Sequence, residues 1–186
     1  MHQNLKKDVM ELGGDIVESD RFAKAQDVIH HAKDRNIYNH SLKTAGLALS
    51  IARWLGRRGV AVSEEDTVRA GLLHDIGMTE SSVSESPSYR KAFSHPREGV
   101  RIAREEFGAN ATQADAIRHH MWPIGIVPPK TPEGWAVLAA DKLCSTTEAI
   151  IITKDKLGHA ISTQISSLGK TRQERNGDGR QEHLGR

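Results

Sequence analysis

The sequence predicts an all-α protein that folds as a single compact helical domain. Residues that cap helices recur along the 186-residue chain, and apolar residues between them follow helical spacing. Alternating β-branched runs are absent, and no Asn-Gly or Asp-Gly turn joins two such runs. A chain of this length can bury the core of one domain.

The first half of the chain contains three expected helices. Residues 20–33 carry apolar side chains near helical spacing. Residues 40–56 place a second apolar stripe on one face, and Gly56 is expected to end that helix. Ser63, followed three residues later by Asp66, forms a capping-box pattern that opens the third helix.

A serine-rich segment, residues 79–93, comes next. It lacks a steady apolar period, so we expect it to be mostly loop. The following helix is expected over residues 94–108, with Pro96 near its first turn and Gly108 after its last.

The last helices follow a second set of caps. Asn110 is expected to cap a short helix that carries the run AIRHHM. Residues 122–130 cannot form a continuous helix, because their three prolines lack the amide donor. Thr131 is then the N-cap of a long helix through about residue 153, and an amphipathic piece covers residues 155–168.

Composition separates a helical domain over residues 1–168 from a polar tail over residues 169–186, which we expect to be disordered. The tail has five Lys or Arg and three Asp or Glu, which accounts for the net charge of +2 and leaves the domain balanced. We therefore expect no nucleic-acid-binding face. The single cysteine, Cys144, excludes an intramolecular disulfide. No apolar run is long enough to span a bilayer, so we expect a cytoplasmic protein, either a monomer or a homo-oligomer.

Five segments carry histidine or aspartate at a helix end or against an apolar stripe. In the stretch GLLHDIGM, His74 and Asp75 follow two leucines at the end of a helix. The other four segments carry His40, His95, the pair His119 and His120, and Asp141. Buried imidazoles and carboxylates are costly unless they are paired or bound to a metal. Together these groups suit a site for two divalent ions such as Fe, Mn, Zn, Co or Mg, in which a carboxylate can bridge.

Structural alternatives remain open for each group taken alone. A single histidine on an apolar face is usually a hydrogen-bonded core residue. Asp141 could pair with Lys142 or Arg118, and the macrodipole of a helix could favour His119 and His120 at its C-terminus. The joint occurrence of all five segments in this order favours a metal site over these alternatives.

The order of these residues resembles the HD-domain superfamily of metal-dependent phosphohydrolases. The stretch HDIG matches the usual signature of that family, and AADKL resembles its closing aspartate motif. The resemblance extends over about residues 30–155. It implies that the helical domain is an HD-domain bundle.

The resemblance also implies which residues bind two metal ions. The ligands of the first ion would be His40, His74, Asp75 and Asp141. The second ion would be held by His95 and His119, with Asp75 as the bridge between the two ions. Iron or manganese is expected, with zinc, cobalt or magnesium as alternatives.

The implied activity is hydrolysis of a phosphate ester or anhydride in a small phosphorylated substrate, expected to be a nucleotide. A metal-activated hydroxide would attack phosphorus, with His74 and Asp75 at the centre of the catalytic site. Further residues expected to contact the substrate and take up the developing charge are His120, Lys43, Arg97 and Lys142. For His120, a contact with an extra metal ion stays open as an alternative.

Two differences from the cyclic-dinucleotide phosphodiesterases of that family leave the substrate open. Met78 follows HDIG where that subgroup usually has lysine, and MWPIGIVPP replaces its Gly-Tyr-Pro segment. The run HPREGVRIAREEFG is closer to small standalone members, including those that split diadenosine polyphosphates. Two other functions also stay open: a di-iron oxygenase on the same scaffold, and a non-catalytic module that binds metal or nucleotide.

Overall fold

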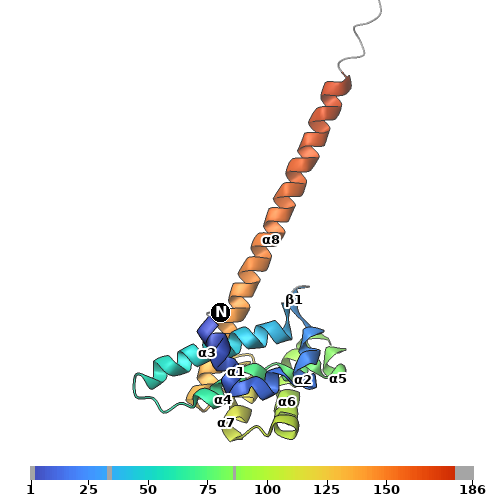
Figure 1. Ribbon diagram of the computed structural model, residues 1–186. Helices are drawn as coiled ribbons and strands as arrows, with labels where there is room; N and C mark the ends of the chain where they lie inside the picture. Colours follow the sequence, from blue (N-terminus) through green and yellow to red (C-terminus); the bar gives the residue numbers. More distant parts are fainter. Residues whose placement is uncertain (1–2, 33–34, 86, 179–186) are drawn as a thin grey trace, which may run out of the picture. The chain divides into compact units, whose positions relative to one another are not determined.

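The computed structural model describes residues 3–32, 35–85 and 87–178, and the predicted all-α class is confirmed (Figure 1). In chain order the elements are α1 (Gln3–Val17), α2 (Asp20–Ala23), the 3-10 helix η1 (Lys24–Gln26), β1 (Ile29–Ala32), β2 (Arg35–Asn36), α3 (Ile37–Gly56), α4 (Glu64–Leu73), the 3-10 helix η2 (Ile76–Thr79), α5 (Ser81–Ser84), α6 (Ser88–Phe107), α7 (Ala111–His119) and α8 (Pro132–Asp178). The chain divides into two compact units, Met1–Thr146 and Thr147–Arg186. The first unit contains every residue of the site described below.

Side-chain caps fix the starts of three helices that carry the site. Ser63, Asn110 and Thr131 each accept a hydrogen bond from the backbone amide three residues later, at 3.1, 2.9 and 3.1 Å. All three predicted caps are confirmed. Gly108 adopts a left-handed conformation (φ 63°) directly after α6, so this predicted stop is confirmed as well.

The helix predicted over residues 20–33 is much shorter in the structure. α2 ends at Ala23, and after η1 the chain forms β1, which pairs antiparallel with β2. Phe22 and Ala25 are the buried apolar residues of α2 and η1. Beyond them the backbone is tied to the start of α3, where the amide of Ile37 donates to the carbonyl of Val28 at 3.0 Å. Pairing with a later segment replaces the helix that local spacing favoured.

The loop predicted over residues 79–93 is largely helical in the structure. α5 occupies its first part, and α6 begins at Ser88, so Pro96 lies inside a helix rather than near its first turn. A proline inside a helix removes the hydrogen bond to the carbonyl four residues earlier. Here Pro96 is buried, and its neighbours on the inner face, His95 and Gly99, are buried as well. Packing of that face therefore outweighs the lost backbone bond.

Both ends of the chain differ from the predicted organisation. α1 was not predicted, yet its Val9 and Ile16 are fully buried. α8 continues through residues 169–178, which belong to the predicted tail, and residues 179–186 of that tail lie outside the described residues. No helix in the described part of the chain is both long and apolar enough to cross a membrane.

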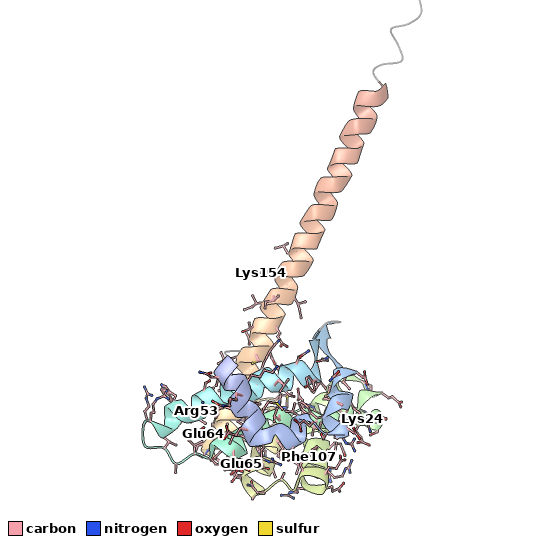
Figure 2. All side chains as sticks on the ribbon, viewed as in Figure 1. Lys24, Arg53, Glu64, Glu65, Phe107 and Lys154 are labelled. Atoms are coloured by element: carbon pink, nitrogen blue, oxygen red, sulfur yellow. The ribbon has the colours of Figure 1, made fainter. Side chains whose placement is uncertain are left out.

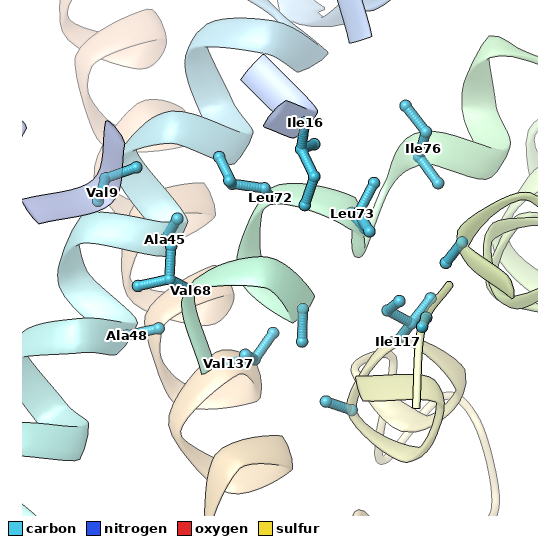
Figure 3. Close-up of a cluster of buried hydrophobic side chains, with 14 of the residues drawn as sticks. Val9, Ile16, Ala45, Ala48, Val68, Leu72, Leu73, Ile76, Ile117 and Val137 are labelled. Carbon is cyan, nitrogen blue, oxygen red and sulfur yellow. The ribbon is translucent and has the colours of Figure 1, made fainter. Parts of the chain in front are cut away.

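The apolar core of the first unit is built around α4 (Figure 3). This helix contacts α1, α3 and α7, and its residues Val68, Leu72 and Leu73 are fully buried. Val137 of α8 is also fully buried in the same cluster. Because His74 directly follows this buried stretch, core packing carries the next two polar residues into the interior.

Two glycines allow backbone to approach closely on either side of the HD pair. A Cβ on Gly71 would lie 2.9 Å from Cα of Ala45, where α4 crosses α3. A Cβ on Gly77 would lie 2.1 Å from the carbonyl oxygen of His95 and 2.6 Å from the amide nitrogen of Gly99, where η2 meets α6. These contacts bring α3 against α4 and α6 against η2, on either side of His74 and Asp75.

Ion pairs connect α1 to α3 and α4. Arg53 of α3 donates to Asp8 of α1 at 2.6 Å and to Glu64 of α4 at 2.9 Å, and Figure 2 shows Arg53 beside Glu64. Arg69 of α4 holds both carboxylate oxygens of Asp15 at 2.7 and 2.9 Å. Exposed pairs of this kind contribute little to stability, so the position of α1 depends mainly on the burial of Val9 and Ile16 in the core.

Gly77→Ala is expected to destabilise the fold by about 3 kcal/mol, because the added carbon meets backbone that no side-chain rotation can move away. Urea denaturation would measure this loss. The control is Gly14→Ala, whose Cβ would meet nothing closer than Met10 Cε at 3.8 Å. Equal stability of both variants would contradict the close approach of η2 and α6.

Candidate metal centre

Six buried side chains from five segments form two adjoining groups. The first group is His40, His74 and Asp141, and the second is Asp75, His95 and His120. Within each group, one ligand atom from every residue lies within 4.8 Å of the others. No member is more than 5% exposed. The five segments singled out in the sequence therefore meet at one place.

Each group is assembled at the ends or inner faces of helices. His40 lies in the first turn of α3, and His74 directly follows α4. His95 lies on the inner face of α6, and His120 directly follows α7. Asp141 lies in the part of α8 that belongs to the first unit.

Asp75 faces both groups at once. Its Oδ2 lies 3.4 Å from Nε2 of His74 and 4.0 Å from Nε2 of His40. Its Oδ1 lies 3.2 Å from Nε2 of His95 and 3.4 Å from Nε2 of His120. The two oxygens of one carboxylate thus point to different sets of imidazoles, which is the arrangement of a bridging ligand.

Asp141 is held from both sides. Its Oδ1 lies 3.2 Å from Nε2 of His40 and 3.8 Å from Nε2 of His74, and it also accepts a hydrogen bond from Ser145 Oγ at 3.1 Å. Its Oδ2 accepts from Lys142 Nζ at 2.9 Å. Ser145 and Lys142 therefore hold the carboxylate of Asp141 so that its Oδ1 faces His40 and His74.

Two of the imidazoles are oriented by the same backbone geometry. Nδ1 of His74 lies 2.8 Å from the carbonyl of Gly71, and Nδ1 of His120 lies 2.8 Å from the carbonyl of Ile117. A carbonyl can only accept, so each Nδ1 must carry the proton and donate it. In the neutral ring this leaves the lone pair on Nε2, which points into the cluster.

The donor set fits divalent cations. Nε2 of His74 is buried without a hydrogen-bond partner, and Nε2 of His95 faces Nε2 of His120 at 3.1 Å. Lone pairs that converge in a dry interior are costly unless a cation lies between them. Separations near 3 Å are those expected between neighbouring ligands of one ion with metal–nitrogen bonds of about 2.1 Å. Imidazole and carboxylate together suit Fe, Mn, Zn or Co.

Burial and charge act in opposite directions on the acid–base properties of the cluster. Burial disfavours the charged form of His74, but the charges of Asp75 and Asp141 prevail and raise the pKa of His74 to about 9. Burial likewise opposes ionisation of Asp75 and Asp141, yet the histidines around them hold the pKa of both carboxyls below the usual range. For His120, burial prevails and lowers the pKa.

The structure differs from the sequence prediction in which of His119 and His120 lies in the second group. The family resemblance implied that His119 is a metal ligand and that His120 contacts the substrate or an extra metal ion. In the structure His120 belongs to the second group, whereas Nδ1 of His119 lies 3.0 Å from Asp115 Oδ1, outside both groups. His119 is the last residue of α7, and its side chain points about 100° away from that of His120, toward Asp115.

Helical periodicity contains the signal that distinguishes the two histidines. The buried residues Gln113, Ile117 and His120 follow each other at spacings of four and three. His119 instead follows the half-buried Asp115 by four residues. Extending the apolar face of α7 by one turn therefore leads to His120 and not to His119.

The three cationic residues predicted to contact phosphate lie in different surroundings. Lys142 lies beside the cluster through its contact with Asp141. Lys43 is exposed on α3. Arg97 is exposed on α6, two residues after His95, and two helical steps rotate its side chain about 200° away from the inner face. A phosphate contact for each of them stays a prediction, and the surroundings of Lys142 favour it most.

Comparison with known proteins identifies one family. A family model described as HD domain matches residues 37–153, which is more than half of the chain. A search of the curated proteins finds no match. The matched range contains all six residues of the two groups.

His120→Ala is expected to lower the bound metal of the purified protein from about two ions per chain to about one, because the second group loses a nitrogen ligand. The matched control is His119→Ala, which should keep the wild-type metal content. Elemental analysis of both variants measures this difference. Loss of metal in His119→Ala with full retention in His120→Ala would show that the sequence assignment was right.

Metal binding at pH 7 is expected to release about one proton, because His74, with a pKa of about 9, is protonated in the metal-free protein and must lose that proton to coordinate. The apparent affinity should therefore rise about tenfold per pH unit between pH 7 and pH 9. Calorimetric titration in two buffers with different ionisation enthalpies counts the released protons. An identical binding enthalpy in both buffers would contradict this expectation.

Proposed function

This chain belongs to the HD domain family, and we propose that it is a metal-dependent phosphohydrolase that cleaves a phosphate ester or anhydride of a nucleotide. The observation that carries the proposal is the position of Asp75. One of its oxygens faces His40 and His74, and the other faces His95 and His120. A carboxylate placed between two groups of imidazoles can bridge a pair of neighbouring divalent ions.

Two divalent ions bound at these positions would lower the pKa of water and neutralise charge on a phosphate. The charge of the ligand set supports an anionic substrate. Four neutral imidazoles and the carboxylates of Asp75 and Asp141 carry two negative charges in total. With two divalent ions the centre would have a net charge of about +2, which complements a phosphate group.

The residues of the chain orient the ligands and keep bulk water out. The carbonyls of Gly71 and Ile117 hold two of the imidazole rings through Nδ1, so that Nε2 points into the cluster. The six ligands are buried, which strengthens every charge interaction at the centre. Lys142 has a side chain that is 41% exposed and reaches Asp141 Oδ2, so its ammonium group lies where the buried cluster meets solvent. There it can contact an incoming phosphate.

The most specific part of the proposal is that the substrate is a nucleotide. Its support is the resemblance of the run before His119 and His120 to small standalone members of the family. An assay of hydrolysis on a panel of substrates would identify the bond that is cleaved, whether in a monoester, a diester or a pyrophosphate. The panel contains nucleoside mono-, di- and triphosphates, cyclic nucleotides and dinucleoside polyphosphates.

Asp75→Asn is expected to reduce phosphate release from the best substrate more than about 100-fold, because the amide keeps the shape of the side chain and loses the charge that both groups share. The full chain is assayed after loading with manganese or iron, and a chelator should abolish the activity of the wild type. The control, Arg104→Gln, changes an exposed residue of α6 and should stay within about twofold of the wild type.

Four outcomes would contradict the proposal. Full activity of Asp75→Ala, or no bound metal together with no stimulation by manganese or iron, would exclude the metal-dependent reaction. Consumption of dioxygen without phosphate release would identify an oxygenase. Tight nucleotide binding without turnover would identify a binding module.

A further inference from the structure

A surface pocket of about 230 Å³ is lined by residues that flank two of the candidate metal ligands in the sequence. Its walls come from the middle of α6, from the end of α7, and from the segment of residues 121–127 that follows it. The residues on which the argument depends are Phe93, Arg118, His119, Ile124, Ile126 and Val127. None of them is a member of the two metal-ligand groups.

The pocket shares its backbone with two of the metal ligands. Pro96, which lines the pocket, directly follows His95. His119 and Met121, which also line it, lie on either side of His120. The pocket is therefore built on the same two backbone segments that carry His95 and His120.

Exposed apolar side chains gather around this pocket. Ile126 is 92% exposed, Phe93 is 63% exposed, and Ile124 and Val127 are about half exposed. Single exposed apolar residues are ordinary, but several around one hollow mark a binding site for an apolar group. The phosphate end of a substrate belongs at the metal ligands, so the apolar hollow beside them suits the remainder of the molecule.

A polar edge accompanies the apolar walls. His119 is held by Asp115, whose other oxygen accepts from the backbone amide of Lys130 at 2.8 Å. The ring of His119 is thereby fixed through Nδ1, and Nε2 is the nitrogen that Asp115 does not engage. The guanidinium of Arg118 adds donors to the same pocket. An occupant with flat apolar faces and polar atoms on its rim matches this lining.

The outer wall is held in place by backbone and ring contacts. The amide of Trp122 donates to the carbonyl of His119 at 3.1 Å, and the amide of Gly125 donates to the carbonyl of Met121 at 3.1 Å. The ring of Trp122 meets that of Trp135 edge-on, with centroids 5.6 Å apart. The pocket is therefore formed before a ligand binds.

We propose that this pocket binds the base of the nucleotide substrate, so that Phe93 and Ile126 contact the faces of the ring and Arg118 and His119 contact its rim. This inference rests on the proposed function and assigns the part of the substrate that is not phosphate. The size of the pocket supports it, because an apolar cavity of about 150 Å³ already holds benzene. A pocket of about 230 Å³ accommodates one ring system and no folded partner.

The test compares substrates with and without a base. The metal-loaded full chain is assayed with the four common nucleoside 5′-monophosphates and with ribose 5-phosphate. Phe93→Ala and Ile126→Ala are each expected to raise KM for the preferred nucleotide about tenfold with kcat unchanged, and to change KM for ribose 5-phosphate less than about twofold. Both side chains are mostly exposed, so their truncation should leave the fold intact.

Val60→Ala is the matched control, because Val60 is an exposed apolar residue that does not line this pocket. It should change neither KM. Equal effects of Phe93→Ala on both substrates, or no effect on either, would overturn the proposal. The same holds if Val60→Ala raises KM for the nucleotide as much as Phe93→Ala does.

A binding measurement keeps the inference separate from the proposed reaction. The four nucleosides, which carry no phosphate, are titrated into the metal-loaded wild type and the variants by calorimetry. We expect one or more to bind the wild type with affinity in the millimolar range or tighter, and Phe93→Ala to weaken that binding about tenfold. If no phosphate is released from any substrate, the proposed function fails. The nucleoside titration still shows whether the pocket binds a base. Absence of nucleoside binding to the wild type would overturn the pocket assignment alone.

Discussion

The fold of the first unit depends on how one buried carboxylate is compensated. Asp75 lies in the interior with an imidazole Nε2 near each of its oxygens, and its charge must be offset by protons or by cations. Without metal, His74 supplies the compensating charge, which is why its pKa is raised to about 9. With metal, the same geometry exchanges that proton for a cation. The surrounding helices must therefore keep a compensating positive charge next to Asp75 both with and without metal.

The arrangement is achieved by close backbone approach rather than by long side chains. Gly71 allows α4 to lie against Ala45 of α3, and Gly77 allows η2 to lie against the backbone of α6 at His95. Each contact joins the HD pair to a different helix that carries a ligand. The carbonyl of Gly71 also orients His74, so one residue serves both the packing of two helices and the direction of a ring.

Local signals predicted the parts of the fold that are decided locally. The caps at Ser63, Asn110 and Thr131 need only a side chain and an amide three residues later, and all three are present. The five segments that meet at the site were also identified from the sequence. A histidine or aspartate next to an apolar stripe is visible there even when the exact helix boundaries are not known. What could not be predicted depended on distant partners or on a single residue step. The pairing of β1 with β2 and the early start of α6 are decided by packing across the domain. The choice between His119 and His120 depended on a single residue step, which the buried periodicity of α7 resolves in favour of His120.

The six clustered side chains also connect distant parts of the chain. His40 and Asp141 are separated by 101 residues, and their side chains lie 3.2 Å apart. The length-dependent part of the entropy lost in closing a loop of that size is about 4 kcal/mol. Neither residue can keep its position if α3 or the first part of α8 separates from the other. Hydrogen exchange in these helices would then occur by one shared opening rather than by independent fraying, so that the cluster makes the ends of the domain a single cooperative unit.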